Sequence, residues 1–117
     1  MPRDFRLYLD DIVEAIARIR RYTTGLSFLQ FAQDEKTVDA VVRNLGVIGE
    51  AVKNIPEEIR QKHASVEWRR VAGLRDILVH QYFGIDVEII WDIVENKLSR
   101  LEESIRDLLG PQDSNNA

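Results

Sequence analysis

The sequence predicts an all-α domain, an antiparallel bundle of four to five helices. Apolar side chains recur at alternating steps of three and four residues, which keeps them on one stripe of an α-helix. Six Gly and three Pro among 117 residues are too few for a β-sandwich, and 44% apolar residues are too many for a disordered chain. At this length we expect one domain over residues 1–110 and a disordered polar tail over residues 111–117.

The first helix is expected from about Asp4 to Thr23. Asp4 can cap its amino end, and Gly25 can take positive φ at its close. The next segment is expected to be a loop that lies against the bundle, because it carries Phe28 and Phe31. The apolar stripe of the first helix consists of Phe5, Leu9, Ile12, Ile16 and Ile19.

A second helix is expected from about Glu35 to Asn54, and Pro56 ends it. Gly49 lies within about 40° of the apolar stripe, so a neighbouring helix can approach its backbone closely. A short third helix should begin near Pro56, where proline and two carboxylates suit a helix start, and continue to about His63.

The fourth helix is expected to span Glu67 to Tyr82, and Asp86 should cap a fifth that runs to Gly110. Ile89 and Ile93 widen the apolar face of the fifth helix to roughly 200°. Either the short helix and the loop cover this excess or a second subunit does. We expect a homodimer, because symmetric dimers are the commonest soluble oligomers.

Composition narrows the classes of function. The absence of Cys excludes disulfides and thiolate-zinc sites, and with two His no metal centre is expected. The net charge of −4 gives no basic signature overall, but residues 1–75 carry 13 Lys/Arg against 11 Asp/Glu, and residues 76–117 carry 3 against 9. A polyanion would be drawn to the first part. Because no apolar run is long enough for a bilayer and the amino terminus is charged, we expect a soluble cytoplasmic protein without a membrane partner.

Three polar residues lie in the most apolar part of the fourth helix: Arg75, His80 and Tyr82. Arginine is permanently charged and forks onto phosphate oxygens, and histidine both takes and gives a proton near neutral pH. This pair suffices for phosphodiester chemistry. On a regular helix the directions of Arg75 and His80 differ by about 140°, so one chain cannot easily aim both at one phosphate. A site assembled across a twofold axis removes this difficulty.

A structural interpretation of the same residues stays open. Arg75 could pair with a carboxylate such as Glu50 or Asp76, while His80 and Tyr82 could be ordinary packing residues near a helix end. His63, in a polar stretch, is expected at the surface.

The order Arg75, four residues, His80, one residue, Tyr82 resembles the Arg-x-x-x-x-His-x-Tyr motif of HepT-like toxins, helical ribonucleases of the HEPN superfamily. The similarity includes RNLGVIGEAVKN at residues 43–54 and WRRVAGLRDILVHQYFG at residues 68–84. The expected helix lengths also agree over nearly the whole chain.

The resemblance implies a homodimer whose two motif segments meet in a cleft and cut RNA without a metal or other cofactor. Arg75 would hold the scissile phosphate and His80 would exchange protons, with Asp76 as a possible auxiliary that orients them. It also implies a type VII-like toxin-antitoxin system. Its partner, an MntA-like nucleotidyltransferase antitoxin, would transfer AMP to Tyr82 and so neutralise the toxin.

Two alternatives belong to other classes. The first is a non-catalytic HEPN module that binds a nucleotide, or serves as a scaffold for the nucleotidyltransferase, and uses Arg75 as an anion contact. The second is a plain dimerisation bundle, in which Arg75, His80 and Tyr82 could all be replaced without consequence.

Overall fold

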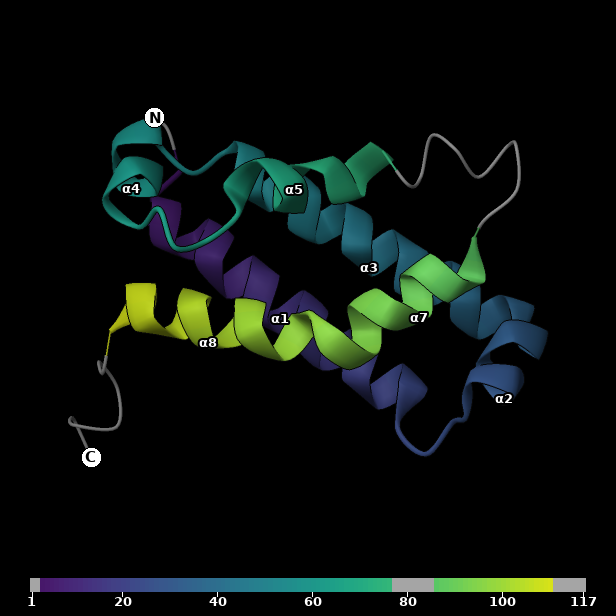
Figure 1. Ribbon diagram of the computed structural model, residues 1–117. Helices are drawn as coiled ribbons and strands as arrows, with labels where there is room; N and C mark the ends of the chain where they lie inside the picture. The colour runs from purple at the N-terminus through teal and green to yellow at the C-terminus, as the bar shows by residue number, and fades with distance from the viewer. Residues whose placement is uncertain (1–2, 77–85, 111–117) are drawn as a thin grey trace, which may run out of the picture.

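A computed structural model describes residues 3–76 and 86–110, and within these ranges the regular structure is entirely helical (Figure 1). The expected all-α fold is therefore confirmed. No helix in the described ranges is both long and apolar enough to cross a bilayer. The elements are α1 (Phe5–Thr23), α2 (Phe28–Gln33), α3 (Glu35–Lys53), α4 (Glu57–Lys62), α5 (Trp68–Ala72), the 3₁₀ turn η1 (Gly73–Arg75), α7 (Val87–Asn96) and α8 (Leu98–Leu109).

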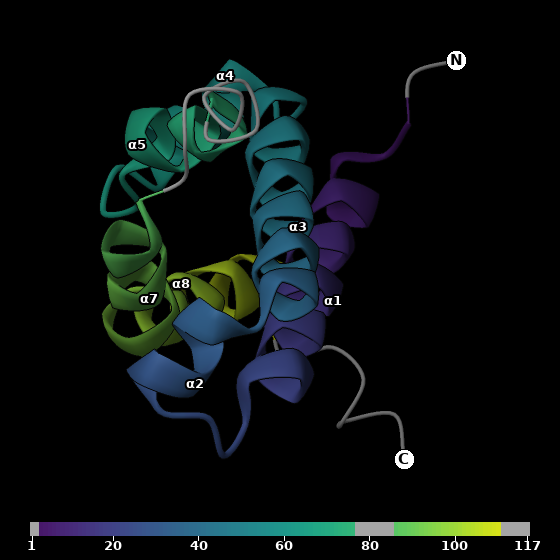
Figure 2. The same ribbon diagram turned by 90° about the vertical axis from the view of Figure 1, so that its right-hand side faces the viewer.

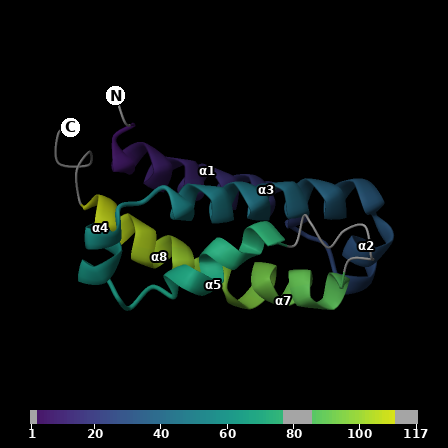
Figure 3. The same ribbon diagram turned by 90° about the horizontal axis from the view of Figure 1, so that it is seen from above.

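The helices form an antiparallel bundle around one core. The long helices α1 and α3 lie side by side in opposite directions, and α8 packs on α1 while α5 and η1 pack on α3 (Figures 1 and 3). Seen along the bundle, α1, α3, α5 and the α7–α8 pair surround the centre (Figure 2). The core is aliphatic, and its fully buried side chains include Leu9, Ile16, Leu45, Ile48, Ile90 and Ile105.

Local signals in the sequence delimit α1 as expected. The Asp4 side chain accepts a hydrogen bond from the Arg6 backbone N–H at 2.9 Å, and Gly25 takes a φ of +82° after the helix ends. Such a φ suits glycine because it lacks a Cβ. The predicted start and end of the first helix are thus confirmed.

The expected loop after α1 is wrong in one respect, because it contains the helix α2. Ser27 and Gln30 form a capping box, in which each side chain accepts a hydrogen bond from the other residue's backbone N–H. Phe31 is fully buried, with its ring centroid 5.0 Å from that of Trp91. The segment does lie against the bundle, and it covers part of the wide apolar face of α7.

The expected single helix after Asp86 is divided into α7 and α8 at Lys97, whose φ is −118°. Asp86 caps α7 as predicted, with its carboxylate accepting hydrogen bonds from the Glu88 and Ile89 backbone N–H groups. Ile93 is half-buried against the core, whereas the Ile89 side chain is 56% exposed. Within the described residues α2 and the core therefore cover only part of the wide face.

The fourth helix departs from the prediction at Gly73. After α5 the chain tightens into η1, so the regular helix expected from Glu67 does not continue through Arg75. The backbone at Ala72 and Arg75 packs closely against Gly49 of α3, and this contact determines the change of geometry. The predicted remainder of this helix, from residue 77 to Tyr82, lies outside the described residues, as does the predicted tail 111–117.

An ion pair between Arg20 and Glu102 joins α1 to α8, and Arg106 also binds Glu102 at 3.0 Å. The Arg20 guanidinium, helped by Arg106, lowers the pKa of Glu102 below its ordinary value of 4.5. A carboxyl whose pKa is lowered by folding stabilises the fold above pH 4.5, and this contribution is lost as the pH falls through the lowered pKa.

We therefore expect Glu102→Gln to lower the free energy of unfolding by about 0.5–1 kcal/mol at neutral pH, the magnitude of a partly exposed ion pair. Urea titrations of both proteins should show this difference at neutral pH, and it should shrink in acid as the pH falls below 4.5 and through the lowered pKa of Glu102. A difference of the same size at neutral pH and in acid would contradict the role of the carboxylate charge.

Candidate functional site

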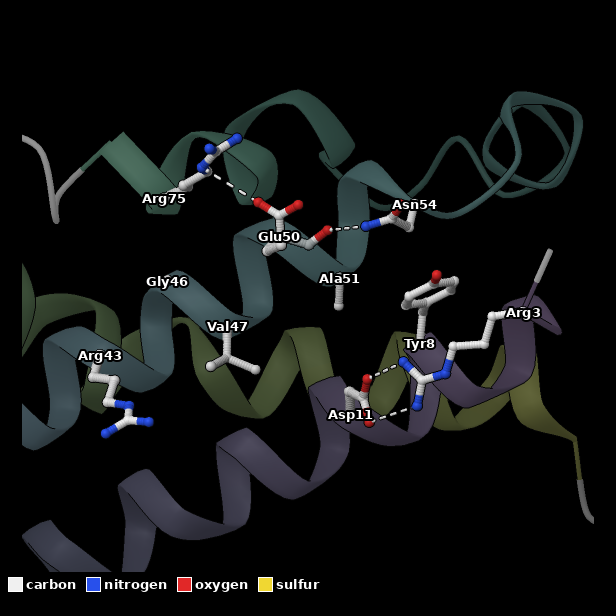
Figure 4. Close-up of a pocket in the computed structure, with 10 residues that line it drawn as sticks. All are labelled: Arg3, Tyr8, Asp11, Arg43, Gly46, Val47, Glu50, Ala51, Asn54 and Arg75. Atoms are coloured by element: carbon white, nitrogen blue, oxygen red, sulfur yellow. Dashed lines mark hydrogen bonds and ion pairs between the residues drawn. The ribbon is translucent and has the colours of Figure 1, made fainter. Parts of the chain in front are cut away.

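A groove of about 450 Å³ lies between the start of α1, the outer face of α3 and η1 (Figure 4). One side is formed by residues of and just before α1, the floor by one face of α3, and the other side by the last residue of η1. Its lining residues are Arg3, Tyr8 and Asp11 on the first side, Arg43, Gly46, Val47, Glu50, Ala51 and Asn54 on the floor, and Arg75 on the second side.

Arg75 extends over this groove, where its side chain is 48% exposed. Its Nε lies 3.3 Å from Oε1 of Glu50, whose side chain is 56% exposed. Figure 4 shows the terminal nitrogens of the guanidinium on the side away from Glu50. Of the two carboxylates expected as possible partners, Glu50 therefore pairs with Arg75, and Asp76 is exposed without an ion pair to any described residue.

The backbone of η1 lies against α3 at Gly49. A Cβ added at Gly49 would lie 2.7 Å from the backbone nitrogen of Arg75 and 3.0 Å from the carbonyl oxygen of Ala72. The first distance is shorter than Cβ atoms show in proteins and the second is very tight, so a side chain at this position would force the backbone of η1 to shift. The predicted close approach at Gly49 is confirmed, and it places the backbone of Arg75 beside the residue that directly precedes its partner Glu50.

The start of α5 is held by the indole of Trp68, which is 8% exposed. Its Nε1–H donates to the carbonyl oxygens of Arg60 and His63, each at 3.0 Å. The side chain of His63 is exposed, as predicted. These bonds and the contact at Gly49 anchor the segment that carries Arg75 at two points.

The α1 side of the groove contains a second ion pair. Arg3 binds Asp11 at 2.7 Å and lies over the ring of Tyr8, with 4.7 Å from its guanidinium carbon to the ring centroid. Asp11 raises the pKa of Arg3 further above its ordinary value. Arg3, Tyr8 and Asp11 were not predicted as site residues, because only the packing of α1 on α3 brings them to the groove. Arg43, on α3 itself, was not predicted as one either.

His80 and Tyr82 lie outside the described residues, so the structure places Arg75, Glu50 and Asp76 of the predicted site. The angle of about 140° expected between Arg75 and His80 depends on residues 77–80, which the structure does not describe, so it stays a prediction.

Comparison of the sequence with known proteins identifies the family of the chain. The family model described as Ribonuclease HepT-like matches residues 12–108. The chain belongs to the HepT-like ribonuclease family. Curated relatives of this HepT-like chain agree with the assignment, and no solved structure matches it.

The first relative, named "Putative RNase MJ0127", is from Methanocaldococcus jannaschii. It is 48% identical, over 97% of this chain and 98% of its own length. A second, named "Putative RNase TTE0752", from Caldanaerobacter subterraneus subsp. tengcongensis, is 40% identical over 89% of this chain and 93% of its own. A third, named "Probable ribonuclease HepT", from Thermococcus cleftensis, is 42% identical over 92% of this chain and 98% of its own.

The match covers all of α3, α5 and η1, and so includes Gly49, Glu50 and Arg75. One side of the groove in this HepT-like ribonuclease is thus formed by Arg75, the arginine of the Arg-x-x-x-x-His-x-Tyr motif. Arg3 and Tyr8 lie before the matched residues.

Proposed function

We propose that the chain is a metal-independent endoribonuclease that uses Arg75 and His80 at a cleft between two copies. The observation that carries this proposal is the exposed guanidinium of Arg75 on a groove, within the motif of a ribonuclease family. A planar guanidinium binds two phosphate oxygens at once, and the fork of Arg75 beyond Nε is directed away from Glu50 (Figure 4).

The chemistry follows from the two side chains. The ribose 2′-oxygen attacks phosphorus as the bond from phosphorus to the 5′-oxygen breaks, which leaves a 2′,3′-cyclic phosphate and a free 5′-hydroxyl. His80 takes the proton of the 2′-hydroxyl or gives one to the leaving 5′-oxygen. Arg75 stabilises the negative charge that develops on the non-bridging oxygens. Asp76, next in the chain, is an auxiliary that orients Arg75 or His80.

This activity is tested with purified protein and single-stranded RNA in the presence of excess EDTA. The proposal predicts cleavage at an unchanged rate and products that end in 2′,3′-cyclic phosphate. Loss of cleavage on chelation would contradict metal independence. If the wild-type protein binds RNA or nucleotides but does not cleave RNA, the result would instead favour the non-catalytic HEPN module.

Glu50 is a positioning residue in this proposal, because it acts through Arg75. Its carboxylate forms an ion pair with Arg75 on the Nε side and so orients the guanidinium, while its negative charge opposes the phosphate. Glu50→Ala removes both effects and is expected to lower kcat about tenfold, because Arg75 loses its orientation. Glu50→Gln keeps an acceptor for Nε without the charge, so kcat should stay near the wild-type value and KM should fall.

Steady-state kinetics of the two variants separate these effects. A purely structural role for Glu50 would reduce kcat in proportion to the folded fraction, which circular dichroism monitors. Equal losses of kcat in Glu50→Ala and Glu50→Gln would contradict the positioning role.

We also propose that a cognate nucleotidyltransferase antitoxin neutralises the enzyme in a type VII-like toxin-antitoxin system. The phenolic oxygen of Tyr82 attacks the α-phosphorus of ATP, so AMP is attached and pyrophosphate leaves. The added nucleotide would put bulk and negative charge beside the RNA cleft, which opposes substrate binding.

Co-expression with the product of an adjacent nucleotidyltransferase gene should add AMP to the wild-type chain, as measured by intact-mass spectrometry. Tyr82→Phe should prevent the addition, whereas Tyr22→Phe, at an exposed tyrosine of α1, should not. An unmodified wild-type chain that is nevertheless neutralised would contradict AMPylation as the mechanism.

A further inference from the structure

The charges of the groove are unevenly paired. Three arginines and two carboxylates line it. Arg3 is paired with Asp11 and Arg75 with Glu50, while Arg43 is exposed and forms no ion pair with any residue in the described ranges. On a chain with a net charge of −4, the positive surplus of this groove is therefore Arg43.

Arg43 and Glu50 lie on the same face of α3, seven residues apart. Seven residues make about two turns, or roughly 10 Å along the helix axis. Adjacent phosphates of a stacked strand are spaced about 3.4 Å along its axis, so this separation spans a few nucleotides. A strand whose phosphate is bound by Arg75, next to Glu50, can therefore place another phosphate at Arg43.

The floor between the two positions suits the uncharged parts of a nucleotide. Val47 lies one turn from Arg43 and about one turn from Glu50, lines the groove, and is 36% exposed as a residue. Figure 4 shows Arg43 and Val47 along α3, on the groove side of the helix. An apolar contact flanked by two guanidinium groups favours a ribose or base between two bound phosphates.

We propose that Arg43 is a second phosphate-binding residue, which holds the RNA backbone a few nucleotides from the phosphate at Arg75. This inference rests on the proposed ribonuclease function and adds a direction for the strand, along α3 from η1 toward the amino end of that helix. Because Arg43 contacts backbone and not a base edge, it strengthens binding to all sequences alike.

The test measures binding of the full chain to a mixed-sequence oligonucleotide of 2′-O-methyl RNA, which lacks the attacking hydroxyl and stays intact. The dissociation constant is determined over a series of KCl concentrations. Arg43→Ala should weaken binding about tenfold and reduce the slope of log K against log salt by about 0.7, the value for one phosphate contact on a single strand. Arg43→Lys should keep the wild-type slope.

Arg100→Ala is the matched control, because Arg100 is exposed on α8 and does not line the groove. It should change neither the affinity nor the slope. If the wild-type protein binds and Arg43→Ala has the same slope as Arg100→Ala, the second phosphate contact is refuted and the proposed function stands. If the wild-type protein does not bind RNA at any salt concentration, both are refuted.

Discussion

Arg75→Ala and His80→Ala are each expected to abolish RNA cleavage while the helical fold is retained. Removing a preorganised donor to a developing oxyanion costs about 10²–10³ in rate, and removing a general acid or base costs about 10²–10⁴. Arg75 is exposed at the end of η1 and its neighbour Glu50 is also solvated, so truncating Arg75 leaves no buried carboxylate without a partner.

Initial rates on a fluorescent RNA and growth after induced expression measure this loss. The chain provides a matched control for each variant. His63 is the other histidine of the sequence and its side chain is exposed, and Arg100 is exposed away from the groove. His63→Ala and Arg100→Ala should keep wild-type rates. Full activity in Arg75→Ala or in His80→Ala would remove that residue from the mechanism.

Gly49→Ala is expected to lower activity through the position of Arg75. The new methyl group would lie 2.7 Å from the Arg75 backbone nitrogen, so η1 must move away from α3. Overpacking of this kind costs about 1–3 kcal/mol, and the better helix propensity of alanine offsets about 1 kcal/mol of it. We expect a net loss of up to about 2 kcal/mol in the free energy of unfolding. Because a displacement of about 1 Å can cost 10²-fold in rate, cleavage should fall about 10- to 100-fold.

Gly73→Ala is the control for this prediction. A Cβ at Gly73 meets no atom within 4 Å, and its φ of −67° suits alanine. This variant should be as active as the wild-type protein and equally or slightly more stable. Urea denaturation and cleavage rates of both variants provide the measurement. Equal stability and equal cleavage rates of Gly49→Ala and Gly73→Ala would contradict the role of Gly49 as the contact of η1 on α3.

Much of the fold follows from patterns that are local in the sequence. The three- and four-residue spacing locates α1 and α3, and Asp4 and Asp86 mark helix starts through their own side chains. Gly49 could be recognised because a glycine on the apolar stripe of a helix implies a close neighbour. These features depend on residues within one or two turns of each other.

The predicted helix bounds are wrong where tertiary packing stabilises a short segment, or where a residue distant in the sequence determines the local geometry. The capping box of Ser27 and Gln30 is present in the sequence, but a helix of six residues depends on tertiary packing for its stability, here of Phe31 in the core and against Trp91 of α7. The break at Lys97 has no glycine or proline to announce it. The turn at Gly73 depends on contact with α3, as the short distances at Gly49 show.

The candidate site likewise has a part that the sequence predicts and a part that only the three-dimensional structure reveals. The sequence offers Glu50 and Asp76 as carboxylate partners because an arginine in an apolar helix commonly pairs with one, and the packing of η1 on α3 selects Glu50. Arg43 lies in a segment that carries the family resemblance, yet only the shape of the groove gives it a role. The wall formed by Arg3, Tyr8 and Asp11 comes from a part of the chain with no motif, and its position depends on how α1 crosses α3.

The proposed function depends most on a site composed of Arg75 from one copy and His80 from the other. Mixing the Arg75→Ala and His80→Ala proteins after reversible denaturation tests this directly, since a mixed dimer then has one intact composite site. With random pairing, about a quarter of the wild-type cleavage rate should return, because half of the dimers are mixed and each has one of two sites. A mixture that stays as inactive as its two components would contradict the shared site.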